Sequence, residues 1–256
     1  MIRLIHNILT TFGINLPQFF ISCYDLPRFI INYFKLVRSK KGDKSFKLFP
    51  DYPVLGEIYK PGGTTTSQYF IQDLFVAKKI YLASPINHYD IGSRVDGFIA
   101  HLATFMDVKV LDIREIPNNV KGIEFIKFDI TNPNSIEFNS IESLSSLHVF
   151  EHIGLGRYGD KIDYLGHESA LKNVYKIMKE NGTFYFSVPI GKQRIQYNAH
   201  RIYSVEYLIN LFNENWNIVN FSYINDEGEL IENQNYQNFD SENIKYGCGI
   251  FILVKK

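Results

Sequence analysis

Residues 87–113 read NHYDIGSRVDGFIAHLATFMDVKVLDI, and this stretch decides the expected fold. An apolar strand pattern ends at Asp90 and runs into a turn that contains Gly92. A helical pattern follows over residues 97–106, and a second strand pattern ends at Asp112. A strand, a glycine turn, a helix and a second strand together predict a βαβ unit, in which a right-handed crossover joins parallel strands.

The alternation of strand and helix patterns continues almost to the C-terminus and predicts an α/β fold with a doubly wound, mainly parallel sheet. Short apolar runs predict strands over residues 87–91, 108–113, 123–129, 143–150, 183–188, 216–224 and 248–254. Helical spacing predicts helices over residues 97–106, 167–179 and 205–213. No helical pattern separates the last two strands, which a polar loop joins, so we expect a C-terminal antiparallel hairpin.

The N-terminal part differs from this pattern. We expect residues 1–48 to form a helical extension of short helices joined by prolines, with the clearest helical spacing over residues 28–37. Residues 49–256 are expected to form the main domain. Its first part is an irregular connection rich in proline and glycine, which leads into a helix over residues 68–81.

Charge and apolar runs limit the partners of the chain. Lys and Arg number 27 and Asp and Glu number 27, so the formal net charge of +0 gives no reason to expect a nucleic-acid partner. Pro17, Asp25, Pro27 and Arg28 interrupt the N-terminal apolar run before it reaches the roughly 20 residues of a membrane span. We expect a cytoplasmic protein without a transmembrane segment, with peripheral membrane contact of the first forty residues as an open alternative.

Acidic residues end the first three predicted strands and therefore meet at one edge of the sheet. The candidate cofactor residues at these ends are Asp90, Gly92, Ser93, Asp112, Ile113, Asp129 and Ile130. Asp112 follows Gly92 by 20 residues, the spacing at which an acid binds ribose hydroxyls, and Asp129 is placed to reach an adenine amino group. One such acid usually caps a turn or a helix, but three in succession favour an adenosine-containing ligand.

The charges of the first turn discriminate between adenosine ligands. A dinucleotide places its pyrophosphate in a glycine-rich turn at a helix N-terminus, where Asp90 and Asp96 would repel it. S-adenosylmethionine has no phosphate, and its cationic amino group can pair with a carboxylate. The sequence therefore favours S-adenosylmethionine as the cofactor.

Four strings of this chain, HYDIGSRVDGFIAHLATF, VLDIRE, SLSSLHVFEHIGLGRYGD and FSVPIGKQRIQYNAHRIYS, resemble a family of predicted class I methyltransferases first catalogued as a domain of unknown function. The resemblance covers roughly residues 50–205. It implies a Rossmann-like, seven-stranded sheet of order 3-2-1-4-5-7-6, and cofactor contacts at Asp90, Gly92, Asp112 and Asp129. The usual motif has glycines where this chain has Arg94 and Asp96, which leaves the detailed cofactor pose open.

A cluster of titratable residues follows the fourth and fifth strands, and its candidate catalytic members are His148, Glu151, His152 and His200. A hydroxyl acceptor needs a base such as His or Glu, or a metal ion, to lose its proton. The H-x-x-E-H spacing with a later His is similar to the ligand set of divalent-metal-dependent O-methyltransferases. Three interpretations stay open, namely a divalent metal site, a metal-free site with a histidine base, and a structural role in supporting the next helix.

Polar residues in the same two loops are candidates for substrate binding, namely Arg157, Asp160, Asn198 and Arg201. Guanidinium groups there could bind a phosphate or carboxylate, although a glycine-rich turn with a paired arginine is also a common structural element. A lining of this kind suits a saccharide, a nucleotide-sugar or a phosphorylated cell-envelope precursor.

The sequence thus predicts an S-adenosylmethionine-dependent O-methyltransferase acting on a small polar substrate, plausible in polysaccharide biosynthesis. One alternative is an NAD(P)-dependent oxidoreductase or epimerase, but the Tyr-x-x-x-Lys pair of such enzymes has no counterpart in the right place. The other alternative is a non-catalytic scaffold that retains the cofactor site. Many titratable groups at the strand ends argue against it, because unpaired buried charge is costly.

Overall fold

The structure is a computed structural model that describes residues 2–116, 120–133 and 136–256. The chain divides into two compact units, residues 1–64 and residues 65–256. Among the described residues, no helix combines the length and apolar character needed to cross a bilayer. The expected domain boundary at residue 48 stays a prediction, and the compact units meet at residue 64.

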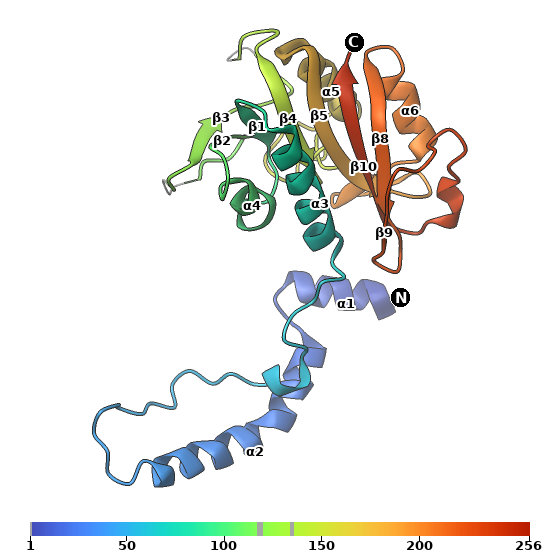
Figure 1. Ribbon diagram of the computed structural model, residues 1–256. Coiled ribbons are helices and arrows are strands. Elements are labelled where there is room, and N and C mark those ends of the chain that lie inside the picture. Colours follow the sequence, from blue (N-terminus) through green and yellow to red (C-terminus); the bar gives the residue numbers. More distant parts are fainter. Residues whose placement is uncertain (1, 117–119, 134–135) are drawn as a thin grey trace. The chain divides into compact units, whose positions relative to one another are not determined.

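The C-terminal unit is built on an eight-stranded sheet of order β3-β2-β1-β4-β5-β10-β8-β9 (Figure 1). Its strands are β1 (His88–Ile91), β2 (Val108–Asp112), β3 (Ile123–Lys127), β4 (Ile141–Leu147), β5 (Met178–Ile190), β8 (Trp216–Ile224), β9 (Leu230–Ile231) and β10 (Gly247–Lys255). Strands β1 to β5 pair in parallel, and β10 pairs antiparallel with β5 and β8. A separate two-stranded sheet joins β6 (Arg194–Gln196) to β7 (His200–Ile202).

The expected mainly parallel sheet with a C-terminal antiparallel hairpin is confirmed. Apart from β9, the main sheet has the expected order 3-2-1-4-5-7-6. Because β6 and β7 belong to the separate sheet, β8 is the sixth strand of this order and β10 is the seventh, and β10 lies between β5 and β8. The expected number of strands was wrong by one, because β9 adds an edge strand inside the segment expected to be only a loop. Two residues of β9 pair with Tyr223 and Ile224, and a strand this short leaves no periodic signal in the sequence.

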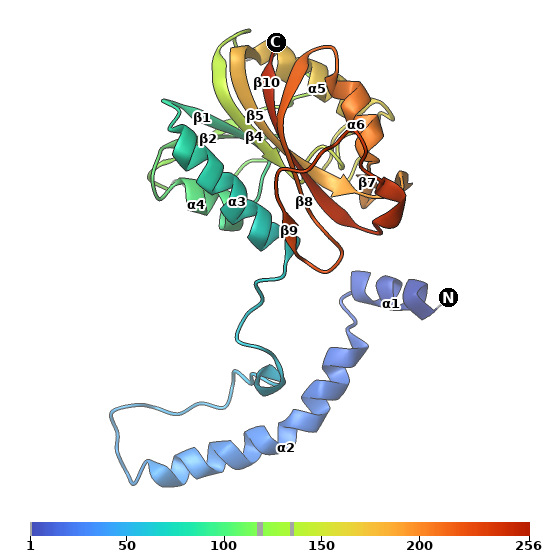
Figure 2. The ribbon, with the colours of Figure 1, turned by 45° about the vertical axis from the view of Figure 1, so that its right-hand side comes forward.

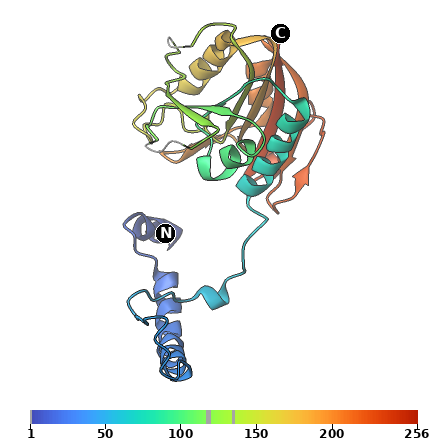
Figure 3. The ribbon, with the colours of Figure 1, turned by 60° about the vertical axis from the view of Figure 1, so that its left-hand side comes forward.

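Helices cover both faces of the sheet, as in other doubly wound folds (Figures 1 and 3). On one face α3 (Gln68–Ala83), a π-helical turn η2 (Val95–Ile99) and a short α4 (Ala100–Leu102) share one apolar core. On the other face α5 (Gly166–Ile177) and α6 (Val205–Phe212) share a second core. The helix expected over residues 97–106 is therefore a π turn followed by a single α turn.

The N-terminal unit contains α1 (Ile2–Thr11), α2 (Leu16–Ser39) and a 3-10 turn η1 (Glu57–Tyr59). The expectation of short helices joined by prolines was wrong, because α2 is one helix of 24 residues with Pro27 inside it. Pro17 lies in the first turn of α2, where backbone N–H groups have no partner within the helix, so proline removes no hydrogen bond there. Pro27 removes one bond of the helical ladder, and α2 bends partway along its length (Figure 2).

Candidate functional site

An open cleft lies where β1, β2, β3 and β4 end, at the carboxyl edge expected for ligands in this class of sheet. It encloses about 650 Å³ of empty space, part of it open to solvent, within the range of small-molecule sites. It is lined by Ile91, Gly92, Leu111, Asp112, Ile113, Arg114, Phe128, Asp129, Ile130, Thr131, His148, Val149, His152, Ile153, Tyr158 and Asp160. Eight of the expected residues therefore share one cleft, namely Gly92, Asp112, Ile113, Asp129, Ile130, His148, His152 and Asp160.

Asp112 ends β2 and is 8% exposed, with its carboxylate already bound to the neighbouring Arg114. Arg114 donates from Nε to Oδ1 (3.0 Å) and from Nη2 to Oδ2 (2.8 Å), and its backbone N–H also donates to Oδ1. The guanidinium of Arg114 stacks over the Tyr158 ring at 4.6 Å. A ligand hydroxyl that binds Asp112 must therefore replace or share the bonds from Arg114.

Asp129 follows β3 and lies on the same cleft. Its Oδ1 accepts bonds from the backbone N–H (2.8 Å) and the hydroxyl (2.7 Å) of Thr131, which holds the turn after the strand. Ile113 and Ile130 line the cleft beside these two acids. The two carboxylates can bind the polar edges of a nucleoside, and the apolar side chains beside them can pack against its flat faces.

Gly92 follows β1 and lies next to Val149, and both residues line the cleft. Its φ of +64° lies in the left-handed region, and a Cβ at this position would lie 3.1 Å from Val149 Cγ1. Both facts favour glycine, because a side chain would strain the backbone and narrow the cleft.

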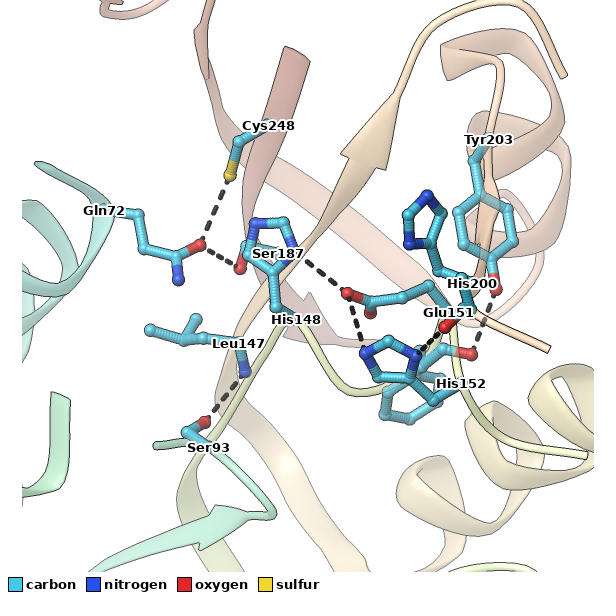
Figure 4. A network of polar contacts seen from close by, with 12 residues as sticks. Gln72, Ser93, Leu147, His148, Glu151, His152, Ser187, His200, Tyr203 and Cys248 are labelled. Carbon is cyan, nitrogen blue, oxygen red and sulfur yellow. Dashed lines mark hydrogen bonds and ion pairs between the residues drawn. The ribbon is translucent and has the colours of Figure 1, made fainter. Parts of the chain in front are cut away.

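Asp90 and Ser93 are not among the residues that line the cleft, and their expected contact with the cofactor stays a prediction. Asp90 is fully buried. Its carboxylate accepts bonds from the backbone N–H (2.8 Å) and the hydroxyl (2.7 Å) of Ser93, and from the hydroxyl of Ser145 (2.5 Å). Ser93 also accepts a bond from the backbone N–H of Leu147 (2.9 Å; Figure 4). Burial raises the pKa of Asp90 to about 6, and the serine bonds oppose this shift. The two residues fasten the first turn to β4.

His148 and Glu151 form a buried pair at the end of β4 (Figure 4). His148 Nδ1 lies 2.9 Å from Glu151 Oε1, and the side chains are 2% and 1% exposed. Burial opposes the charged form of His148, but the side chains of Cys248 and Glu151 outweigh it and hold the pKa of His148 well above its usual value. His148 has a φ of +55°, an uncommon conformation that is enriched at functional sites. In the described part of the chain, His148 Nε2 and Glu151 Oε2 are buried and have no hydrogen-bond partner.

His152 lies on the cleft and has a different environment from His148. Its Nδ1 donates to the backbone carbonyl of Ala199 (2.7 Å), which leaves the lone pair on Nε2. Nε2 lies 3.6 Å from Glu151 Oε1, and the side chain is 12% exposed. Burial lowers the pKa of His152. A neutral imidazole with a free Nε2 at a cleft can accept a proton.

His200 starts β7, and its Nε2 lies 2.8 Å from the side-chain oxygen of Gln196. Its ring centroid lies 6.5 Å from that of His152 and 5.2 Å from that of Tyr246. Within the described ranges, no three His, Cys, Asp or Glu side chains are grouped so that they could hold a metal ion. The arrangement therefore does not support the metal interpretation of His148, Glu151, His152 and His200. A ring nitrogen of His148 faces Glu151, one of His152 faces the Ala199 carbonyl, and one of His200 faces Gln196.

Most of the candidate substrate residues have structural partners. Asp160 accepts bonds from the backbone N–H groups of Gly154, Gly156 and Tyr158, and so holds closed the glycine-rich loop, residues 154–160. Arg201 is 4% exposed and donates to the backbone carbonyls of Ile153, Asp163 and Tyr164. These contacts do not favour the expected role of Arg201 in gripping an anion.

Arg157 and Asn198, the other two candidate substrate residues, both lie at the turn between β6 and β7. Arg157 Nη1 donates to the carbonyl of Ala199 (2.9 Å), the same oxygen that His152 binds. Asn198 is exposed in the turn between β6 and β7. Arg157 therefore joins the glycine-rich loop to this turn, next to His152.

Tyr69 and Gln72 lie on the helix predicted over residues 68–81, where the sequence allowed either a cover for the cofactor or an ordinary amphipathic face. The Tyr69 ring of α3 lies 4.8 Å from the His148 ring. The side-chain oxygen of Gln72 accepts bonds from Ser187 on β5 (2.7 Å) and Cys248 on β10 (3.3 Å; Figure 4). Tyr69 and Gln72 lie 79 and 76 residues before His148 in the chain, so no local spacing connects them to it. The fold alone assembles this end of the site.

A family profile described as "Caenorhabditis protein of unknown function, DUF268" matches residues 99–251. This match covers more than half of the chain. The chain belongs to the DUF268 family. No curated protein matches it in sequence.

The fold of this DUF268 protein is similar to several solved structures. The [4+2]-cyclase SpnF has a TM-score of 0.53 at 10% identity, over 72% of this chain and 80% of SpnF. The 1,6-didemethyltoxoflavin-N1-methyltransferase of Burkholderia thailandensis, solved with S-adenosylhomocysteine, has a TM-score of 0.53 at 12% identity, over 75% of this chain and 79% of that enzyme. YcgJ of Bacillus subtilis has a TM-score of 0.50 at 10% identity, over 73% of this chain and 98% of YcgJ. These likenesses confirm the Rossmann-like methyltransferase fold.

Proposed function

We propose that this DUF268 protein is an S-adenosylmethionine-dependent methyltransferase. Its proposed reaction is O-methylation of a small polar acceptor, such as a saccharide, a nucleotide-sugar or a phosphorylated cell-envelope precursor. The observation that carries the proposal is one cleft that has Asp112 and Asp129 at one part and His148 and His152 at another. This cleft can hold a nucleoside cofactor beside a proton-accepting group.

The residues of the cleft fit the cofactor in charge and shape. Asp112 would hold the ribose hydroxyls after Arg114 releases its bidentate contact, and Asp129 would accept from the adenine amino group. Ile113 and Ile130 offer apolar surface for the purine. When bound, S-adenosylmethionine supplies an electrophilic methyl group on a sulfonium, and its net positive charge suits an acidic cleft.

His152 is the residue best placed to act as the general base. The Ala199 carbonyl fixes the proton on Nδ1, so Nε2 can accept the proton of an acceptor hydroxyl as that oxygen attacks. The imidazolium formed in this step carries a positive charge, which the Glu151 carboxylate at 3.6 Å stabilises. Removing the hydroxyl proton makes the acceptor oxygen a stronger nucleophile.

His148 is less suited to this role, because Cys248 and Glu151 raise its pKa and favour its protonated form. In that form one N–H points to Glu151, and the buried Nε2, which has no hydrogen-bond partner among the described residues, can donate to a bound ligand. A buried donor without a partner costs free energy, so a ligand oxygen that binds it is stabilised in that position. We assign His148 the role of positioning a ligand oxygen.

Titration calorimetry with S-adenosylhomocysteine tests the cofactor assignment first. We expect binding in the wild type, and no measurable heat at tens of micromolar protein would contradict the proposal. Cofactor binding alone does not demonstrate methyl transfer, because the fold is also similar to that of a cyclase.

Turnover is then measured by mass spectrometry over a panel of saccharides, nucleotide-sugars and phosphorylated sugars. His152→Gln should lower turnover at least about 100-fold while the affinity for S-adenosylhomocysteine changes little. His101→Gln, at a histidine outside the cleft, serves as the matched control. Equal loss of turnover in both variants, or none in His152→Gln, would remove His152 from the mechanism.

A further inference from the structure

One face of α2 in the N-terminal unit is covered by the segment that follows it. The backbone N–H of Gly56 donates to Asp25 Oδ2 (2.8 Å), and Gln18 Nε2 donates to the carbonyl of Leu55 (3.4 Å). A Cβ at Gly56 would lie 2.6 Å from Ile21, so the segment packs closely against the helix. The polar groups of this face are thereby used within the unit.

The opposite face of α2 is apolar and exposed. Ile30, Ile31, Phe34 and Val37 fall within about 120° of the helix circumference at 3.6 residues per turn. They are 45%, 54%, 55% and 43% exposed. Phe19 and Phe20, nearer the N-terminus of α2, are 59% and 67% exposed. We call these six residues the apolar stripe; exposed apolar groups of this size mark an interaction surface.

The charges around the apolar stripe are arranged in two blocks. From residue 4 to residue 34, Asp25 and Arg28 are the only Asp, Glu, Lys or Arg residues, and they neutralise one another through bonds of 2.5 and 2.7 Å. The next block, residues 35–47, holds six Lys or Arg residues and one Asp, and we call it the basic segment. Residues 1–64 hold nine Lys or Arg and four Asp or Glu, whereas the rest of the chain holds 18 and 23.

We propose that α2 binds in the plane of an anionic lipid surface, with the apolar stripe at the boundary of the acyl chains and the basic segment on the lipid phosphates. A helix with one apolar face, followed by cations and aromatic residues, is the usual element of interfacial binding. Phe46 and Phe49, in and beside the basic segment, are 83% and 67% exposed and can enter the same interface. A neutral protein surface would satisfy the apolar stripe but not the basic segment, so the charge pattern favours lipid.

Flotation of the full chain with vesicles tests this proposal. Vesicles of phosphatidylcholine alone are compared with vesicles that contain about one third phosphatidylglycerol, each at low and high salt. We expect the protein to float with the anionic vesicles at low salt, and the bound fraction to fall at least about tenfold with neutral vesicles or at high salt.

Variants separate the two parts of the surface. Ile31→Ser with Phe34→Ser should abolish flotation, whereas Ile86→Ser with Val219→Ser, at residues of the C-terminal unit that are 85% and 64% exposed, should leave it unchanged. Replacing Lys40, Lys41 and Lys44 by Gln should weaken binding at least about tenfold, and Lys78→Gln with Lys172→Gln should not.

Three outcomes would overturn the proposal. The first is absence of flotation with anionic vesicles, and the second is equal binding to neutral vesicles. The third is a dimer in light scattering that Ile31→Ser with Phe34→Ser converts to a monomer, since the apolar stripe would then bind a second copy of the chain. Calorimetry with S-adenosylhomocysteine on the same preparations tests the cofactor site independently, so failure of one proposal leaves the other standing.

Discussion

Glu151 Oε1 lies 2.9 Å from His148 Nδ1, in a pair whose side chains are almost completely buried. The same oxygen lies 3.6 Å from His152 Nε2, so one carboxylate faces two histidines with opposite protonation preferences. This relationship favours the charged form of His148 and the neutral form of His152, four residues apart in the chain. The proposed acid–base chemistry rests on this difference.

Glu151→Gln should lower the pKa of His148, because the variant removes the negative charge that favours the imidazolium. NMR titration of the imidazole resonances measures this shift without knowledge of the acceptor. Turnover, once an acceptor is found, should fall at least about tenfold. Glu142→Gln, at the other end of β4, is the control. An unchanged titration of His148 in Glu151→Gln would show that the pair does not set its charge.

Asp112→Ala should weaken binding of S-adenosylhomocysteine by about 1–3 kcal/mol, because charge-assisted hydrogen bonds to the ribose are lost. Asp96→Ala removes a carboxylate that is 76% exposed and paired with Arg94, and it should leave the affinity nearly unchanged. Titration calorimetry on both variants makes the comparison. Equal affinities would place the ribose elsewhere.

Gly154→Ala should destabilise the glycine-rich loop far more than Gly159→Ala. Both glycines have positive φ, +80° and +85°. A Cβ at Gly154 would lie 2.0 Å from the carbonyl oxygen of Asp163, whereas no atom lies within 4 Å of one at Gly159. We expect a loss of about 1–2 kcal/mol at Gly159 from the backbone alone, and a clearly larger loss at Gly154. Thermal unfolding of the two variants tests this, and equal losses would contradict it.

His88 should make the stability of the C-terminal unit depend on pH. It is buried between the hydroxyls of Ser143 (2.7 Å) and Ser145 (2.9 Å), and burial lowers its pKa to about 3. Because the unfolded chain takes up this proton near pH 6.5 and the folded chain does not, stability contributed by neutral His88 is lost as pH falls from about 6.5 to about 3. The slope is about 1.4 kcal/mol per pH unit for one proton. Urea unfolding of the wild type and His88→Asn at several pH values measures it, and parallel curves would count against the assignment.

The contribution of Asp90 to stability should depend on pH with the opposite sign from that of His88. Burial raises its pKa to about 6 in the folded chain, so the folded state holds a proton that the unfolded state releases between pH 3.8 and 6. The wild type should therefore lose stability relative to Asp90→Asn as pH rises through that window. Urea unfolding at pH 4 and pH 7 compares the two; a constant difference would show that Asp90 does not carry the extra proton.

The sequence alone predicted the sheet apart from β9, and it brought together half of the candidate site. The period of the apolar residues predicted the strands, and parallel strands bring their carboxyl ends to one edge, so spacing alone placed Asp112, Asp129, Gly92, Ile113 and Ile130 in the cleft that they share. The direction of a side chain at a strand end is not encoded in that spacing. Asp90 therefore carried the same signal as Asp112 but points into the core, where serine hydroxyls bind it.

Only the tertiary structure decided the different environments of the two histidines. Burial lowers the pKa of His152, and the carbonyl of Ala199, 47 residues further along the chain, sets its tautomer. Cys248 from the last strand and Glu151 raise the pKa of His148 against the effect of burial. Likewise, only the fold shows that the segment at Gly56 covers one face of α2 and leaves the opposite, apolar face exposed. Local patterns set secondary structure, whereas the pKa of a buried group is set by the atoms that the fold brings next to it.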